Sequence, residues 1–221
     1  MSTDRIGVLG SGDVGRALGS GFARHGWDVA VGSRDPGKLH DWRDDVGGSV
    51  ADDGSVSVGS FADAAAHGDV AVLAVRGAAA LDALDLAGHD NFAGTLLLDT
   101  TNPLDFSGGM PPHLLFGGTD SLGERIQSAL PDAHVVKCFN TVSNAQMVDP
   151  EFEEGTPPMF ICGDDADAKG RTEDILVELG WPGTMDVGDI ESARHLEALV
   201  PLWVRVGSVM DTSEHAFKAV Q

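Results

Sequence analysis

Short apolar runs alternate with helix-like segments from residue 5 to about residue 133. The runs, each rich in Val, Ile or Leu, cover residues 5–10, 28–33, 56–59, 69–75 and 95–100. They are too apolar for strands that keep one face in water. The segments between them end at glycine or a similar breaker and cover residues 15–26, 60–68 and 79–90. The pattern predicts an α/β fold of the Rossmann type, a doubly wound parallel sheet with helices on both faces.

The pattern changes at about residue 150. A further strand over residues 133–140 extends the sheet, and the segment "PEFEEGTPP" then interrupts it with proline and glutamate. The rest of the chain predicts a strand, a helix, a short strand and a last helix, over residues 159–163, 167–180, 183–188 and 191–206. We therefore expect a Rossmann domain over residues 1–150 and a small C-terminal α/β subdomain over residues 151–221 that packs on it.

A glycine-rich loop joins the first predicted strand to the first predicted helix. In "GSGDVG", three glycines have the G-x-G-x-x-G spacing, and the strand before them and the helix after them make this spacing specific. Gly10 permits a tight turn, Gly12 lets backbone amides approach a pyrophosphate, and Gly15 lets the helix pack closely on the strand. The pyrophosphate is then favoured by the free N–H groups and the dipole of the helix N-terminus. The loop predicts a dinucleotide site made of Gly10, Ser11, Gly12, Asp13, Val14 and Gly15.

The end of the second predicted strand favours NADP over NAD. A carboxylate at this place would accept a hydrogen bond from the ribose 2′-hydroxyl of NAD. The sequence instead reads "VGSRDPGK", with Ser33, Arg34 and Lys38 as donors suited to a 2′-phosphate. Asp35 is the discordant residue, and it could pair with Arg34 at the surface. We expect NADP to bind here.

Polar residues follow the other predicted strands, where ligands of open α/β sheets bind. The residues that could line the nicotinamide and its ribose are Ala74, Val75, Arg76, Asn102, Pro103 and Asn140. Asn102 either contacts the cofactor or starts a turn with Pro103. Arg76 either anchors a substrate phosphate or is a surface charge. No spacing typical of a catalytic triad, a nucleophilic cysteine or a metal site is found, so no catalytic residue is assigned.

Composition limits the partners of the chain. With 35 acidic and 14 basic residues its formal net charge is -21, which disfavours nucleic acid and anionic membranes. The acidic residues are scattered and Lys is scarce, which favours a salt-rich cytoplasm of a halophile, an ordinary acidic cytosolic protein being the alternative. The sequence has no signal-peptide pattern and no apolar run near the ~18 residues of a membrane span, so we expect a cytoplasmic protein. Cys138 and Cys162 lie in apolar runs and are expected to be buried.

Several motifs together resemble one family over nearly the whole chain. They are "GSGDVG", "VGSR" with Lys38 after it, "TNPL", "VKCFNT", "FICGDD" and "DVGDIESARHLEALVPLW". The chain is similar to the NADPH-dependent reductases of the deazaflavin coenzyme F420, and to the oxidoreductase domains of the six-transmembrane metalloreductases. Asn140 stands where the better-defined deazaflavin reductases have histidine, and "FNT" looks like the metalloreductase version.

The resemblance implies a cleft between the two parts of the chain and hydride transfer between NADP(H) and a second, small-molecule redox substrate, coenzyme F420 or FMN. It also implies that residues 10–15 bind the pyrophosphate, and that Ser33, Arg34 and Lys38 bind the 2′-phosphate. An anionic deazaflavin needs a local basic pocket, for which Arg76, Arg125 and Lys137 are candidates.

Two other functions stay open. One is reduction of a small imine or keto acid, which is disfavoured because such reductases append a larger helical domain than the residues after Pro150 could form. The other is a non-catalytic module that senses NADP(H). The last predicted helix carries apolar residues at helical spacing, for burial against the sheet or across a homodimer: Leu196, Leu199, Leu202, Trp203 and Val206. We expect a homodimer, whose partner would add a second wall to the site.

Overall fold

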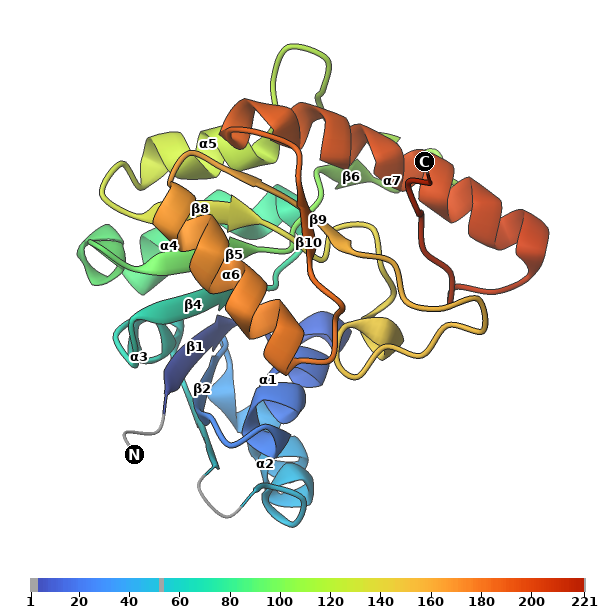
Figure 1. Cartoon of the computed structure of the whole chain (residues 1–221). Coiled ribbons are helices and arrows are strands. Elements are labelled where there is room, and N and C mark those ends of the chain that lie inside the picture. The colour runs from blue at the N-terminus through green and yellow to red at the C-terminus, as the bar shows by residue number, and fades with distance from the viewer. Residues whose placement is uncertain (1–3, 52–53, 221) are drawn as a thin grey trace.

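The computed structural model describes residues 4–51 and 54–220, and within them one eight-stranded sheet has the order β10-β9-β8-β5-β4-β1-β2-β3 (Figure 1). The strands are β1 Arg5–Leu9, β2 Asp28–Gly32, β3 Ser55–Gly59, β4 Val70–Leu73, β5 Leu96–Asp99, β8 His134–Lys137, β9 Met159–Gly163 and β10 Thr184–Asp186. From β3 to β8 every neighbouring pair is parallel, and this part has the strand order of a Rossmann sheet. The predicted fold class is confirmed.

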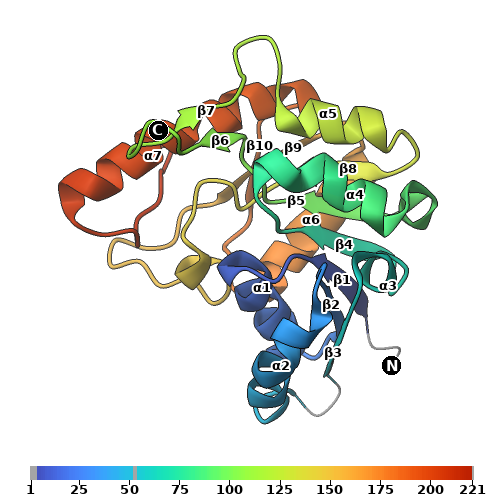
Figure 2. The same cartoon turned by 180° about the vertical axis from the view of Figure 1, so that it is seen from behind.

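Helices cover both faces of the sheet, because successive strand residues point to opposite sides. In β4, Val70 and Val72 join one apolar core with helices α1 and α6, and Ala71 and Leu73 join the other with α3, α4 and α5. Figure 2 shows the layer of α3, α4 and α5 in front of the sheet. The helices are α1 Asp13–Arg24, α2 His40–Gly47, α3 Phe61–Ala65, α4 Ala80–Ala87, α5 Leu122–Ala129, α6 Ala166–Glu178 and α7 Ala193–Met210.

The two strands after residue 150 continue the same sheet. β9 pairs with β8 in the antiparallel direction and β10 pairs with β9 in parallel. The predicted C-terminal strands are therefore present, and the domain boundary between residues 150 and 151 stays a prediction. Residues 1–3 and 221 of the two predicted parts lie outside the described residues.

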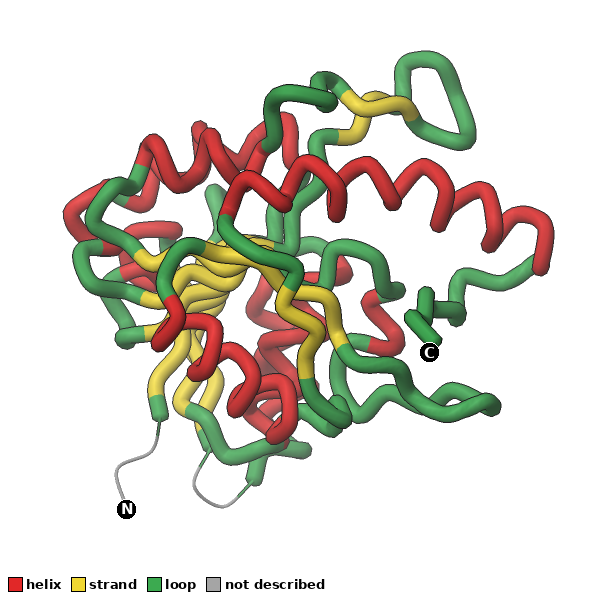
Figure 3. Tube along the Cα trace, turned by 45° about the horizontal axis from the view of Figure 1, so that its top comes forward, coloured by secondary structure: helices red, strands yellow, loops and turns green. Residues whose placement is uncertain are grey.

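Helix α7 lies across the carboxyl ends of the strands, and its C-terminal half extends beyond the sheet (Figure 3). The chain then turns back, so that the ring of His215 stacks on Trp203 with 4.6 Å between ring centroids. The indole Nε1 of Trp203 donates to the carbonyl of His215 at 3.1 Å. Near α7, a short hairpin of β6 Leu104–Asp105 and β7 His113–Leu114 follows the end of β5.

Candidate active site

The glycine loop has the geometry of a phosphate cradle. Gly10 has φ +146°, and a Cβ there would lie 2.1 Å from the carbonyl oxygen of Ala74. A Cβ on Gly15 would lie 2.1 Å from the carbonyl oxygen of Gly10, so α1 begins in close contact with the loop. A Cβ on Gly12 would meet nothing within 4 Å. Since Gly12 caps α1 without a side-chain hydrogen bond, the first amides of the helix face an open space suited to an anion.

The end of β2 lies beside this loop. The hydroxyl of Ser33, which is 6% exposed, donates to Ser11 Oγ at 3.2 Å and accepts from the N–H of Asp35 at 3.1 Å. Arg34 and Lys38 are exposed. The carboxylate of Asp35 pairs with Lys38 at 3.4 Å and not with Arg34, contrary to the surface pairing considered from the sequence. The three predicted 2′-phosphate ligands thus lie close together in the sequence, just after β2. Ser33 is held by hydrogen bonds, whereas Arg34 and Lys38 are at the surface.

The sequence reasoning missed a third basic residue of this edge. Arg16, on the first turn of α1, donates from Nε to the carbonyl of Ser11 at 3.0 Å and from a terminal nitrogen to the carbonyl of Lys38 at 3.4 Å. Its guanidinium therefore bridges the glycine loop and the turn that carries Lys38. Its position directly after Gly15, one helical turn from the loop amides, is the sequence feature that could have identified it.

The predicted nicotinamide residues form a continuous edge next to the loop. Ala74 contacts the loop at Gly10, and its N–H donates to the carbonyl of Leu9 at 2.8 Å. Farther along the edge, Asn102 Nδ2 donates to the carbonyl of Asn140 at 2.9 Å, and Asn140 Nδ2 donates to Asn102 Oδ1 at 3.2 Å. The two amides join the ends of β5 and β8.

Asn140 is buried and is held through its amide nitrogen and its backbone carbonyl. It is 5% exposed, and its Nδ2 also donates to the carbonyl of Leu196 in α7 at 2.8 Å. Its Oδ1 has no hydrogen-bond partner among the described residues. The residue before it, Phe139, has the left-handed φ of +59°, which a bulky residue adopts only where the surroundings impose it. Pro103 is buried next to Asn102, while Val75 is half-buried and Arg76 exposed at the end of β4.

Beneath this edge lies a buried ionic triad of Asp99, Lys137 and Glu197. The Nζ of Lys137 is 2.7 Å from Asp99 Oδ2 and 3.0 Å from Glu197 Oε1, and the three side chains are at most 2% exposed. Burial alone would lower the pKa of Lys137, but the two carboxylates outweigh it and raise that pKa. Burial raises the pKa of Glu197, against the opposing effect of Lys137.

Two of the three candidates for a basic substrate pocket are therefore committed elsewhere. Lys137 is fully buried in the triad, where no anion from solution reaches it. Arg125 pairs with Asp120 at 2.5 Å and lies 3.5 Å above the ring of Phe116. Arg76 remains as the exposed candidate.

The cysteines are buried and free, as predicted, and they make the chain sensitive to alkali. Burial raises the pKa of Cys138, and raises that of Cys162 to about 12. Lys137 also keeps its proton to higher pH when folded. Between the unfolded and folded pKa of each group the unfolded chain binds fewer protons, so rising pH favours unfolding by about 1.4 kcal/mol per pH unit and group.

Denaturant unfolding measured from pH 8 upward is therefore expected to show a steady loss of stability above about pH 9, the unperturbed thiol pKa. The chain has no tyrosine to add to this slope. Cys162→Ala should flatten the slope without abolishing it, because Cys138 and Lys137 remain. An identical slope in that variant would contradict the role of the buried thiol.

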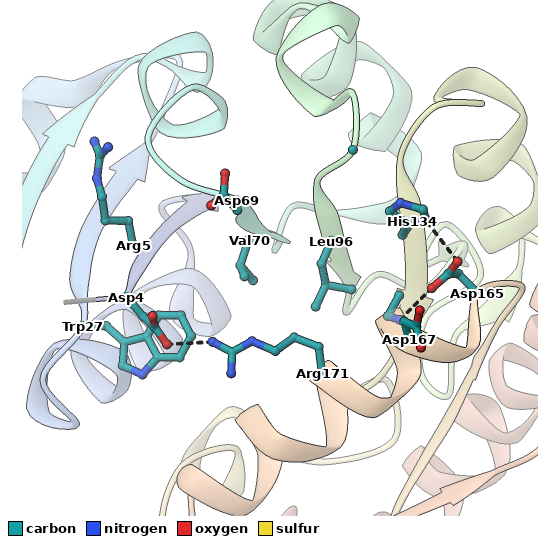
Figure 4. A pocket seen from close by; sticks show the side chains of 12 residues that line it. Asp4, Arg5, Trp27, Asp69, Val70, Leu96, His134, Asp165, Asp167 and Arg171 are labelled. Carbon is teal, nitrogen blue, oxygen red and sulfur yellow. Dashed lines mark hydrogen bonds and ion pairs between the residues drawn. The ribbon is translucent and has the colours of Figure 1, made fainter. Parts of the chain in front are cut away.

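A hollow of about 450 Å³ lies at the opposite edge of the sheet, where strands begin (Figure 4). In its lining, Arg171 pairs with Asp4 at 2.7 Å, and His134 lies 3.6 Å from Asp165. Ligands of open α/β sheets bind at the carboxyl ends of the strands. The candidate active site is therefore the edge formed by the glycine loop and the two asparagines.

Comparison with known proteins indicates the family of the chain. Residues 5–103 match the family model for NADP oxidoreductase, coenzyme F420-dependent. A crystal structure of an Arthrobacter sp. FB24 protein, itself provisionally assigned as an F420-dependent NADP reductase, is 39% identical, with all of both chains covered and a TM-score of 0.91. The F420-dependent NADP reductase of Methanothermobacter thermautotrophicus is 28% identical over 91% of this chain and 88% of its own.

A third relative is Metalloreductase STEAP3 of Rattus norvegicus, 29% identical over 90% of this chain. The chain spans only 38% of the length of that protein. None of the helices in the described part of the chain combines the length and the apolar character that a membrane crossing requires.

Proposed function

Because the chain belongs to the family of coenzyme F420-dependent NADP oxidoreductases, we propose that it transfers a hydride between NADP(H) and coenzyme F420. The observation that carries the proposal is the open phosphate cradle at Gly12 beside a cluster of three cations, Arg16, Arg34 and Lys38, in a chain of net charge -21. An anion is drawn to that place on an otherwise repulsive surface.

The residues at the glycine loop and at the end of β2 suit the two phosphate groups of an NADP molecule. The unfilled space at Gly12 and the uncapped start of α1 suit the pyrophosphate, and Ser33 with the cations suits the 2′-phosphate. At the other end, the unpartnered Oδ1 of Asn140 is an acceptor that the protein itself does not use. The remaining predicted cofactor residues lie between these two places.

Bound NADP(H) supplies or accepts the hydride, and the chain contributes alignment. Asn102 and Asn140 hold the ends of β5 and β8 in a fixed relation, and the loop before Gly77 carries Val75 and Arg76 to the same edge. We propose that this edge supports the nicotinamide and that Arg76 attracts the anionic deazaflavin. FMN is the competing second substrate.

We further propose a homodimer through the C-terminal half of α7. Leu202, Val209 and Met210 are more than half exposed and fall with Val206 on one helical face, and Phe106 and Met110 of the adjacent hairpin region are also exposed. Sedimentation equilibrium in molar salt tests the dimer, and a monomer there would overturn it.

The net charge of the chain supports a halophilic, cytoplasmic protein. Thermal unfolding that does not shift to higher temperature in molar KCl would count against this proposal.

The deciding experiment mixes the purified protein with NADPH and either coenzyme F420 or FMN in molar salt and follows oxidation of NADPH. Turnover with F420 alone supports the proposal. Turnover with FMN alone keeps the oxidoreductase and removes the deazaflavin. Tight NADPH binding without turnover on either moves the assignment to another substrate or to a sensing module.

Removal of one cation should separate NADPH from NADH. Arg34→Ala is expected to weaken NADPH binding about 10- to 100-fold, because a charged hydrogen bond to phosphate contributes ~1.5–3 kcal/mol, and to leave NADH binding within about threefold. Titration of nicotinamide fluorescence measures both. Arg43→Ala, which removes a half-buried arginine of α2 that pairs with Asp44, is the matched control. An equal loss for both nucleotides would refute the 2′-phosphate role.

A further inference from the structure

We propose that the buried triad of Asp99, Lys137 and Glu197 is a positioning device that fixes the Asn102–Asn140 amide pair for hydride transfer. The inference rests on the proposed function for the reaction itself, and on the observed contacts for the positioning.

The ammonium of Lys137 ties two strand ends together. Its Nζ donates to the carbonyl of Thr101 at 2.8 Å, and that carbonyl belongs to the residue directly before Asn102. Lys137 itself ends β8, three residues before Asn140. Asp99 adds a second tie, because its Oδ1 accepts from the N–H of Thr101 at 2.9 Å and from its hydroxyl at 2.6 Å.

Helix α7 holds both members of this arrangement through consecutive residues. The carbonyl of Leu196 accepts from Asn140 Nδ2 at 2.8 Å, and the carboxylate of Glu197 contacts Lys137. The same carboxylate accepts from the N–H groups of Leu122 at 2.9 Å and Gly123 at 3.0 Å, so it also caps α5. One turn of α7 thus joins the amide pair, the ammonium and a neighbouring helix.

The chemistry of the group supports positioning over plain packing. A well-packed apolar side chain could fill the same volume at no loss of stability, since buried ion pairs seldom stabilise more than apolar residues of that size. An apolar side chain cannot hold the Thr101 carbonyl, whereas the ammonium of Lys137 donates to it and at the same time forms ion pairs with Asp99 and Glu197. The group therefore fixes the position of a backbone segment at the reacting edge.

The test uses a double variant that keeps the buried net charge. Lys137→Met with Glu197→Gln removes one positive and one negative charge and leaves Asp99 with its bonds to Thr101. We expect hydrogen exchange of the ligand-free protein to quicken over residues 99–105 by about tenfold or more, while NADPH affinity stays within about threefold. Turnover should fall about 10- to 100-fold in kcat, the effect of a misplaced reacting edge.

Arg194→Met is the matched control. Arg194 joins α7 to α5 through Glu124 at 2.5 and 2.8 Å, but it has no bond to the Thr101 segment, so exchange over residues 99–105 should not change. If the double variant fails to fold, Glu197→Gln alone, which removes one of the two carboxylates that hold the Lys137 ammonium against Thr101, should still raise exchange at residues 99–105 more than Arg194→Met does.

Unchanged exchange over residues 99–105 in a folded double variant overturns the positioning role, and so does a loss confined to NADPH affinity. The exchange experiment needs no substrate. Absence of turnover in the unaltered protein would therefore remove the proposed reaction while leaving the positioning result readable.

Discussion

Replacement of Gly10 by alanine is expected to abolish stable folding of the cofactor edge, while the same change at Gly12 leaves the fold intact. At Gly10 the methyl group would lie 2.1 Å from the Ala74 carbonyl oxygen, at a φ that side chains rarely adopt. The combined clash and strain should cost about 3 kcal/mol or more. At Gly12 the methyl group meets open space at a φ of -78°, so the loss should stay within about 1 kcal/mol.

The Gly12 variant is the one in which NADPH binding can be measured in a folded protein. Gly12→Ala puts its methyl group where the pyrophosphate is proposed to lie, and we expect NADPH affinity to fall about tenfold or more in a protein of near-normal stability. Denaturant unfolding and fluorescence titration measure the two effects separately. If Gly12→Ala binds NADPH normally, the open face of the loop is not the phosphate site.

The second large effect is expected at Lys137. Lys137→Ala leaves two buried carboxylates without their cation, which should cost about 3–5 kcal/mol of unfolding free energy. Lys38→Ala, which removes an exposed lysine paired with Asp35, is the control and should change stability little.

The pH dependence of this loss identifies its cause. Unpaired buried carboxylates have raised pKa values, so the unfolded chain releases their protons at lower pH than the folded variant does. The deficit of Lys137→Ala should therefore be largest near neutral pH and shrink as the pH falls and the buried carboxylates take up protons. A deficit that is constant across this range would point to lost packing instead.

The sequence predicts the parts of the structure that depend on residues close together in the chain. The apolar runs, the glycine loop and Ser33 each have a local pattern, and the structure has the strands and the loop where they were expected. Helices α2 and α5 were not predicted. None of the residues of α2 is fully buried, and α5 is only eight residues long with Leu122 and Ile126 as its large buried side chains, so both are short for recognition from the sequence.

The misassigned residue, Lys137, shows where local reasoning ends. A single cation inside the apolar run "HVVKCF" must be paired when the strand is buried. Its partners, Asp99 and Glu197, lie on β5's end and on α7, far apart in the sequence and adjacent only through the sheet order. Arg16 was missed for a similar reason, because its acceptors belong to two different loops.

The contacts of Leu196 and Glu197 also determine the order in which the site can be completed during synthesis. The glycine loop and the six strands of the parallel part of the sheet, β1–β5 and β8, leave the ribosome before α7 does. Until α7 emerges, Asn140 lacks its Leu196 acceptor, Lys137 has one carboxylate instead of two, and the first two amides of α5 lack the Glu197 carboxylate. A nascent chain that ends at Pro150 therefore carries the glycine loop but an unfinished form of the proposed nicotinamide edge, so under the proposed function nucleotide recognition and catalytic competence arise at different times in the life of the polypeptide.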